Sequence, residues 1–534
     1  MDFNAPDIDY AGLSPILALT GGLVAVLLAA VALPRRAERA VVSALTFITL
    51  AVTAGLCIWR WGERIDLVSG ALRLDELALI ATLIAIVSAA FAVVLSWGEE
   101  ATEAAPGPAG HGEFQALLLG SVLGMLLLAS AQNTVMFFVG LEMLSIPLYV
   151  LCGSAIRRAQ ALEAGLKYLI VGSLGSALVL YGLALLYGAT GATDFNAIRE
   201  GIGGSLVDDP LVLVGIALVG TGLAFKLSIA PFHQWTPDVY QGAPTPVTAF
   251  MAVATKAAAF AVLIRFFDVA LGPAAADWRP ALAALATVSI IVGNVGAIGQ
   301  NSLKRLLGYS GVAQAGYMLA GVVAFSEGGV DAVLFYAAVY VFMNLAAFGV
   351  IVVRERETEF GDDIRAVQGI GRDRPALAWP ITIAMLALAG LPGTAGFIGK
   401  LFLIEAAVGA DYTWLGVMIV VGSMISLAYY LRVIAWVWMR PAYDADPTPE
   451  APHRTLPAMA GGAPEADAVA EGGLRDQPEP ERAAPVRAGR PGVVVALTLA
   501  MAAATIFFGV WPSPLVDLAA DAGEAISATL SALQ

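Results

Sequence analysis

Seven ionisable side chains lie within or at the ends of long apolar runs, and their chemistry is that of proton transfer. A charge held at the centre of a bilayer costs about 2.5–3.5 kcal/mol, so such a residue indicates function. Burial disfavours the charged form of lysine, whereas a nearby carboxylate favours it. A lysine whose carboxylate partner moves can therefore take up and release a proton. The seven residues are Glu142, Lys226, Lys256, Arg265, Lys400, Glu405 and Arg432.

Depth in the apolar run separates these residues. At 1.5 Å per residue, Glu142 lies about 14 Å into the run 133–154, close to the middle of a hydrocarbon core about 30 Å thick. Lys256 lies ten residues into the run 246–269 and has a similar depth. Three mid-membrane lysines with one evident carboxylate cannot all be paired, so we expect at least one lysine to be unpaired or neutral for part of the time.

The other three charges are expected to have simpler roles. Arg265 can pair with Asp268 three residues further along a helix, or extend to the membrane interface. Glu405 is expected at the outer rim of its run. For Arg432 an interfacial position and a buried polar network remain equally open.

The elements that carry these charges must be membrane-spanning helices. The chain has 534 residues, of which 59% are hydrophobic and 13% charged, whereas soluble domains carry about 25% charged residues. We predict an all-α polytopic membrane protein with about 14 transmembrane helices, because a span needs about 20 apolar residues. The runs are 12–33, 41–59, 75–97, 114–131, 133–154, 165–189, 210–230, 246–269, 280–300, 305–325, 331–353, 376–408, 412–439 and 492–511.

The distribution of basic residues predicts the orientation. Segments on one side of the predicted membrane carry 19 lysines and arginines, and those on the other side carry five. The more basic side faces the cytoplasm. The sequence therefore predicts a multi-pass protein of the bacterial inner membrane with both termini periplasmic.

Several other classes of function are disfavoured. Two cysteines and three histidines stand far apart, which argues against a disulfide framework, a metal site or an iron–sulfur cluster held by this chain alone. A net charge of −14 argues against nucleic-acid binding by a basic surface. No phosphate-binding loop or dinucleotide fingerprint is found.

One segment, 441–490, differs from the rest in composition. It holds nine prolines, nine acidic residues and five arginines, and such a composition cannot bury enough apolar area to fold alone. We predict a disordered cytoplasmic loop. The predicted organisation is an N-terminal three-helix segment (1–113), two repeats of five helices (114–269 and 280–440), this loop, and a last transmembrane helix with a periplasmic tail (491–534).

Two of the apolar runs are expected to be broken helices. Pro231 and Pro237 follow Lys226 closely, and the run 376–408 contains Gly-Leu-Pro-Gly at 390–393 before Lys400. Proline removes a helical hydrogen bond and clashes with the preceding turn. Interrupted helices at corresponding places in two halves are typical of transporters built from repeats, with the ion site at the break. Because each repeat would have an odd number of helices, the two would be inverted.

Three strings closely resemble a known family. They are FFVGLEMLSIPLYVL (137–151), LAFKLSIAPFHQWTPDVYQGAPTPVTAFMAVATKAAAF (223–260) and LAGLPGTAGFIGKLFLI (388–404). They resemble the antiporter-like membrane subunits of proton-pumping NADH–quinone oxidoreductase, respiratory complex I. Within that family the chain is similar to subunit N, because Lys256 lies in an Ala-Thr-Lys sequence where subunits L and M usually place a histidine-containing sequence. Subunit M also has glutamate at the place of Lys400, and the long C-terminal lateral helix of subunit L is not found here.

The resemblance implies roles for individual residues. Glu142 and Lys226 would form the ion pair of the first half-channel, Lys256 the central relay, and Lys400 the residue that passes the proton outward. His233 and Tyr240 could extend the relay through water, or be structural.

The resemblance also implies what lies outside this chain. No cofactor is expected here, while NAD, FMN, iron–sulfur clusters and quinone belong to other subunits. The expected partners are subunits M, K and J and membrane lipids, with no nucleic acid.

Two alternatives remain open. One is a subunit of a multisubunit cation/proton antiporter, which shares the fold and the Glu/Lys pattern. The other is a structural role in which the buried charges only fix the register of the helices. NADH dehydrogenase activity and flavin in the purified complex, as opposed to sodium efflux without them, would separate complex I from the antiporter.

Overall fold

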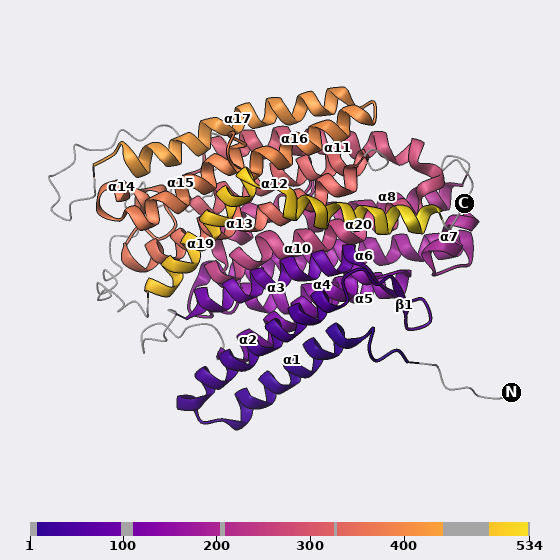
Figure 1. Ribbon diagram of the computed structural model, residues 1–534, viewed down its shortest axis with the longest axis horizontal. Coiled ribbons are helices and arrows are strands. Elements are labelled where there is room, and N and C mark those ends of the chain that lie inside the picture. The colour runs from indigo at the N-terminus through magenta and orange to yellow at the C-terminus, as the bar shows by residue number, and fades with distance from the viewer. Residues whose placement is uncertain (1–7, 98–110, 203–208, 325–327, 442–490, 532–534) are drawn as a thin grey trace, which may run out of the picture.

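The computed structural model describes residues 8–97, 111–202, 209–324, 328–441 and 491–531 (Figure 1). Within these ranges the chain is a bundle of helices with one small β-hairpin. Thirteen helices in this part are long and apolar enough to cross a membrane. The predicted all-α polytopic architecture is confirmed. The predicted loop 441–490 lies, from residue 442 onward, outside the described residues.

The thirteen long helices follow the predicted runs closely. They are α1 (Ser14–Ala32), α2 (Arg35–Trp59), α3 (Glu76–Ser96), α4 (His111–Ser130), α5 (Thr134–Cys152), α6 (Ala159–Thr190), α8 (Pro210–Leu227), α10 (Thr245–Arg265), α11 (Ala275–Ile298), α12 (Leu303–Val323), α13 (Gly329–Glu357), α17 (Thr413–Trp438) and α19 (Pro491–Val510). The remaining α-helices are α7 (Phe195–Gly201), α9 (Trp235–Gly242), α14 (Ile370–Asp373), α15 (Pro375–Ala389), α16 (Ala395–Gly409) and α20 (Ser513–Ser531).

Polar caps determine where several of these helices begin. Asp75 accepts a hydrogen bond from Ala78 N at the start of α3, and Asn133 accepts one from Met136 N at the start of α5. Such residues satisfy backbone N–H groups that have no partner within the helix.

Two apolar runs are interrupted where the lysines lie. Helix α8 ends at Leu227, and the chain turns through 228–234 before α9 begins. The run 376–408 is divided into α15 and α16, which are separated by residues 390–394. Gly390 stands at the end of α15 with a φ of 84°, a left-handed conformation that a side chain disfavours. The inverted relation of the two repeats stays a prediction.

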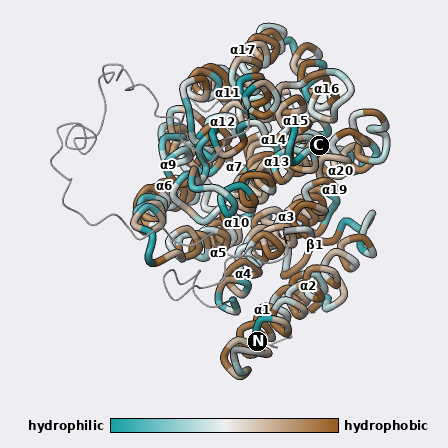
Figure 2. Tube along the Cα trace, turned by 90° about the vertical axis from the view of Figure 1, so that its left-hand side faces the viewer, coloured by the Kyte–Doolittle hydropathy of each residue, from teal (hydrophilic) through white to brown (hydrophobic). Residues whose placement is uncertain are grey.

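The helices that carry the buried polar groups lie in the interior of the bundle. Every residue of α10 from Thr245 to Arg265 is buried, and most residues of α3, α12 and α13 are also buried. Figure 2 shows α10 and α13 within the bundle, with α1 and α2 at one edge and α17 at the opposite edge. A helix that is apolar all round fits such an interior position. Lys256 of α10 is therefore surrounded by protein.

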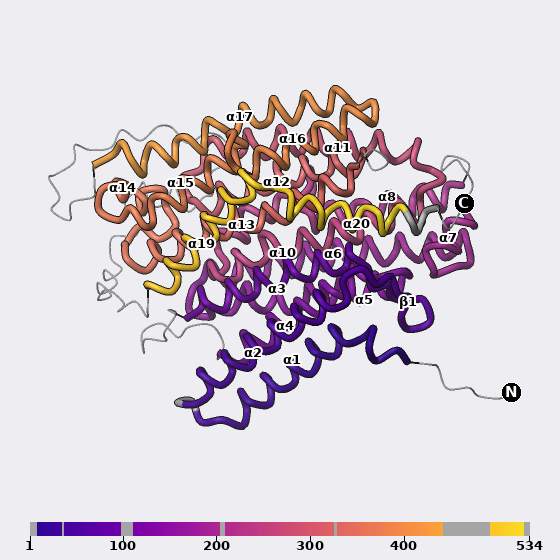
Figure 3. The backbone as a smooth tube through the Cα atoms, viewed as in Figure 1, coloured from indigo at the N-terminus to yellow at the C-terminus, as the bar shows by residue number. Residues whose placement is uncertain are grey.

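The C-terminal region differs from the predicted tail. After α19 the chain turns at Pro512 and continues as the amphipathic helix α20, which packs on α13 and α3 (Figure 3). The indole of Trp61 donates to Asp521 of α20 at 3.0 Å. The sequence predicted neither this helix nor the β-hairpin, which is formed by β1 (Ile65–Leu67) and β2 (Leu72–Leu74). The beginning of α1 and the end of α20 lie at the same end of the molecule (Figure 1).

Candidate functional site

Lys226 lies in the last turn of α8, directly before the interruption. Its side chain is 3% exposed, and Nζ donates to Ser145 Oγ at 2.8 Å and to Tyr168 OH at 3.0 Å. The carboxyl end of a helix carries a partial negative charge, which stabilises a cation. The break in α8 thus gives Lys226 a favourable dipole and two hydroxyl partners from α5 and α6.

Glu142 lies on α5, three residues before Ser145, and therefore on the same face of that helix. The structure places Ser145 and Tyr168, and no carboxylate oxygen, in direct contact with Lys226 Nζ. Oε1 of Glu142 is buried and has no hydrogen-bond partner in the described part of the chain. The ion pair between Glu142 and Lys226 thus stays a prediction. Ser145, which accepts from Lys226, lies on the same face of α5 as Glu142.

Lys256 lies in the middle of α10. Its side chain is 2% exposed, and Nζ donates to the carbonyl of Gly311 on α12 at 2.7 Å, while the ring of Tyr340 lies 5.5 Å from Nζ. A side chain at Gly311 would place its Cβ 2.5 Å from Nζ. A side chain at this position would therefore displace the ammonium group of Lys256.

Lys400 lies in the second turn of α16 and spans the break before it. Nζ donates to the carbonyls of Leu388 and Ala389 at 2.9 and 3.1 Å, and the ring of Tyr317 lies 4.8 Å away. These carbonyls are at the end of α15, where they lack helical partners. A Cβ at Gly390 would lie 2.9 Å from Lys400 Cδ. Lys400 therefore binds the carboxyl end of α15, and Lys226 lies in the last turn of α8.

Helix α12 connects the sites of Lys256 and Lys400. Gly311 accepts from Lys256, and Gln314 lies three residues further along the same helix. Gln314 Nε2 donates at 3.2 Å to the carbonyl of Leu388, which also accepts from Lys400. Gln314 of α12 therefore shares a hydrogen-bond acceptor with Lys400.

Hydroxyl groups surround Gln314. Tyr430 OH lies 3.3 Å from Gln314 Nε2 and 2.5 Å from Ser310 Oγ. Tyr336 donates from its hydroxyl to Gln314 Oε1. Hydroxyls both donate and accept hydrogen bonds. The group Ser310, Gln314, Tyr336 and Tyr430, here called the α12 polar cluster, thus provides a buried hydrogen-bonded link toward Lys400.

Three of the buried lysines share one electrostatic property. Among the described residues, Lys226, Lys256 and Lys400 have no carboxylate oxygen within 4.0 Å of Nζ, and each binds only hydroxyl or carbonyl oxygens. An uncompensated buried cation is costly. This arrangement fits a lysine that passes between its charged and neutral forms better than it fits a permanent ion pair.

The two auxiliary candidates lie near the break after α8. His233 lies in the turn, its Nδ1 is buried without a partner among the described residues, and its ring centroid is 6.2 Å from that of Tyr309. Tyr240 of α9 is 1% exposed and packs edge-on against Trp235, with ring centroids 6.3 Å apart. Trp235 in turn stacks on Tyr168, which binds Lys226. In this series of contacts, which runs from Lys226 to Tyr168 and on to Trp235, Tyr240 comes after Trp235.

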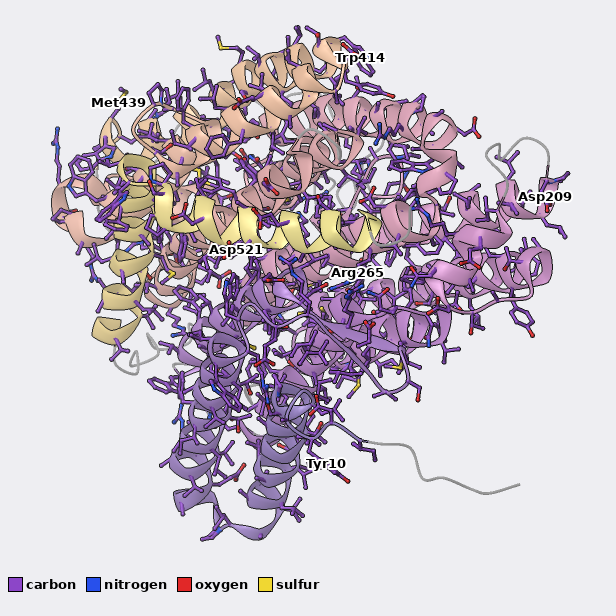
Figure 4. All side chains as sticks on the ribbon, turned by 45° about the vertical axis from the view of Figure 1, so that its right-hand side comes forward. Tyr10, Asp209, Arg265, Trp414, Met439 and Asp521 are labelled. Atoms are coloured by element: carbon purple, nitrogen blue, oxygen red, sulfur yellow. The ribbon has the colours of Figure 1, made fainter. Side chains whose placement is uncertain are left out.

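Two basic residues lie in surroundings that differ from the expected ones. Arg265 was expected to pair with Asp268 or to extend to the interface, but it is fully buried and forms an ion pair with Asp75, while Nε donates to Ala129 O at 2.6 Å (Figure 4). The packing of α3 against α10 brings this more distant carboxylate closer. Lys304 lies in the first turn of α12, but it is 1% exposed and its Nζ lies 3.5 Å from Glu355 Oε1.

The other two charges have structural contacts. Arg432 donates to the carbonyls of Ile298 and Gln300 at 3.2 Å, which places it at the carboxyl end of α11. This contact favours a polar network over a purely interfacial position. Glu405 is exposed, as expected for the rim of its run.

The α12 polar cluster and the partners of Lys226 were missed in the sequence. The available signal was spacing: Ser310 and Gln314 are four residues apart on one helix face, and Ser145 is three residues from Glu142. Tyr168, Tyr336 and Tyr430 gave no such signal, because an aromatic residue in an apolar helix is an ordinary core residue.

Comparison with known proteins identifies the family of this chain. Residues 131–426, more than half of the chain, match the family model described as NADH:quinone oxidoreductase/Mrp antiporter, TM. The chain belongs to this family. It is 41% identical over 387 residues to NADH-quinone oxidoreductase subunit N of Trichlorobacter lovleyi, covering 72% of this chain and 78% of that one. It is 37% identical over 542 residues to subunit N of a Parafrankia species, covering 97% and 95%.

Solved structures of the family share the fold. A chain in respiratory complex I from Thermus thermophilus with bound aureothin is 33% identical, with a TM-score of 0.74, over 94% of this chain and 98% of that chain. A chain of the Mrp complex from a Dietzia species is 23% identical, with a TM-score of 0.79, over 99% of both chains. At that identity the second match concerns the fold alone.

Proposed function

We propose that this chain is subunit N of a proton-translocating NADH–quinone oxidoreductase and that it moves protons through its buried lysines. The observation that carries the proposal is the set of three buried lysines without carboxylate partners, in a chain similar over most of its length to relatives named subunit N. Redox chemistry belongs to other subunits, where NAD, FMN, iron–sulfur clusters and quinone are bound. This chain contributes the proton path.

The path begins at Glu142 and Lys226. Glu142 attracts the cationic form of Lys226, and a change in their separation alters the proton affinity of the lysine. Ser145 and Tyr168 hold the ammonium group in place. His233 and Tyr240 extend this half of the path through water.

Lys256 is the central residue of the path and Lys400 is the outer one. The α12 polar cluster carries the proton between them, because its hydroxyls can donate and accept in turn. Lys400 binds the carbonyl ends of α15 in its charged state and releases its proton toward the periplasm. The two inverted repeats, 114–269 and 280–440, place one broken helix in each half of this path.

In this proposal the protein lies in the bacterial inner membrane, with both termini on the periplasmic side. The basic bias of one side supports this orientation. Its neighbours in the complex are subunit M on one side and the small subunits K and J on the other, and lipids fill the remaining surface.

The test is purification of the complex through a tag on this chain. The complex should oxidise NADH, contain flavin, and acidify the interior of inverted membrane vesicles when NADH is added. A complex without flavin that moves sodium instead would contradict the proposal and favour the cation/proton antiporter, with which this chain shares the fold.

A further inference from the structure

A groove runs along one face of α6, beside α9 and the break after α8. Its first part is a polar cavity of about 300 Å³ near the beginning of α6. Six charged side chains surround it. The basic ones are Arg158, Lys167 and Arg305, and the acidic ones are Glu163, Asp238 and Asp362.

The second part of the groove is an apolar cavity of about 370 Å³. It is formed by one face of α6 and by the aromatic residues around the break. Leu174 is 61% exposed and Val171 is 38% exposed, so this part opens to the lipid side of the helix. Its principal lining residues are Val171, Leu174, Leu178, Phe225, Phe232 and Trp235.

The two cavities are consecutive. Lys167 of the polar part and Val171 of the apolar part are one turn apart on α6, and Trp235 and Asp238 are one turn apart on α9. Figure 2 shows α6 and α9 side by side at one edge of the bundle. From Lys167 to Leu178 the helix rises about 17 Å. Half of a hydrocarbon core is about 15 Å thick, so the groove has the length of one leaflet.

The charges of the polar cavity are of both signs and are partly unsatisfied. Lys167 binds Glu163 at 2.7 Å and Asp238 at 3.1 Å, and Arg305 binds Asp238 at 2.5 Å. Burial raises the pKa of Asp238, but hydrogen bonds from Arg305 and Lys167 outweigh this and hold the pKa below its ordinary value. The guanidinium of Arg158 has no partner among the described side chains and is exposed beside this cluster. The cavity therefore offers one free guanidinium, that of Arg158, for a phosphate, next to carboxylates that could accept from a cation.

We propose that this groove binds a phospholipid with a primary ammonium headgroup, phosphatidylethanolamine. The phosphate binds Arg158, and the ammonium group donates to Asp362 and to Glu163, which also accepts from Lys167. One acyl chain lies along Val171, Leu174 and Leu178 in the apolar part. The equal number of acidic and basic side chains favours a zwitterionic headgroup over an anionic one.

The position of this lipid gives it a role in the proton path. The acyl chain covers Trp235, which stacks on Tyr168 with ring centroids 4.7 Å apart. Tyr168 OH accepts from Lys226. The lipid therefore covers the membrane-facing side of the rings of Trp235 and Tyr168, which lie between Lys226 and the membrane. The binding itself does not depend on the proposed function.

Two variants and a matched control test the proposal in the intact complex. Leu174→Trp fills the apolar cavity from its open side, and Arg158→Gln removes the phosphate donor. Leu180→Trp is the control, since Leu180 is 48% exposed on the same helix and lines neither cavity. Lipids retained by the detergent-purified complex are counted by native mass spectrometry, followed by rebinding of phosphatidylethanolamine, phosphatidylglycerol or phosphatidylcholine.

We expect Leu174→Trp to retain one phosphatidylethanolamine fewer than the wild type, and Leu180→Trp to retain the same number. Arg158→Gln should weaken rebinding on the order of tenfold, the effect of one charge-assisted hydrogen bond. Equal retention in all variants, or equal rebinding of phosphatidylglycerol or phosphatidylcholine, overturns the proposal. If Leu174→Trp prevents assembly because a neighbouring subunit occupies the groove, Arg158→Gln will rebind lipid normally, which also overturns it.

Discussion

Replacing Gln314 with leucine should stop proton transfer between Lys256 and Lys400 at a small cost in stability. The side chain of Gln314 has three hydrogen-bond partners: the carbonyl of Leu388 and the hydroxyls of Tyr430 and Tyr336. Leucine has a similar volume and leaves no large cavity, but it can neither donate nor accept.

The cost in stability can be worked out partner by partner. The carbonyl of Leu388 keeps its bond from Lys400, and Tyr430 keeps its bond with Ser310. Within the described residues only the hydroxyl of Tyr336 loses its partner. One unsatisfied buried hydroxyl costs about 1–3 kcal/mol. The complex should therefore assemble in Gln314→Leu.

The effect on transport should be much larger than the effect on stability. Positioned proton-transfer groups contribute about 10²–10⁴-fold to rates, so we expect proton pumping per NADH oxidised to fall by at least about tenfold. The assay measures NADH oxidation and the proton gradient in the same inverted vesicles, after the amount of assembled complex has been determined. Gln314→His, which can still donate and accept, should retain part of the pumping.

The matched control is Gln115→Leu. Gln115 lies on α4, far in sequence from the three lysines. It is also fully buried, and its Nε2 donates to Ser43 Oγ at 3.1 Å. This variant loses a comparable hydrogen bond and should pump normally. Full pumping by the assembled Gln314→Leu complex, or an equal loss in both variants, would refute a proton path through the α12 polar cluster.

Three further predictions concern the lysine sites. In Lys400→Arg the positive charge is kept but is effectively never released, so vesicles should lose pumping, whereas Lys400→Glu should keep part of it; the reverse order would indicate a structural counter-charge. Glu142→Ala should assemble and pump much less per NADH, and normal pumping would exclude a role for this carboxylate with Lys226. Gly390→Ala forces a side chain into a φ of 84° and toward Lys400, which costs about 1–3 kcal/mol; it should lower both the melting temperature and pumping. Gly191→Ala, at a φ of 70° with open space around its Cβ, should lower only the melting temperature, and equal pumping losses in the two glycine variants would contradict the proposed contact.

The sequence alone determined the helices and the identity of the central residues. Apolar runs of about 20 residues specify spans because backbone groups in lipid must be satisfied within the helix. Lys226, Lys256 and Lys400 were recognisable because a charge in such a run is rare. Gly390 and Pro392 indicated the interruption between α15 and α16 for equally local reasons.

The hydrogen-bond partners of these residues were decided by tertiary structure. Arg265 pairs with Asp75, 190 residues away in the sequence, in place of the nearby Asp268. Lys226 binds Tyr168, 58 residues away. Helix periodicity predicts which residues share a face, but the faces that meet depend on how all the helices pack. Long-range contacts of this kind leave no local pattern, and the same holds for the packing of α20 on α13 and α3.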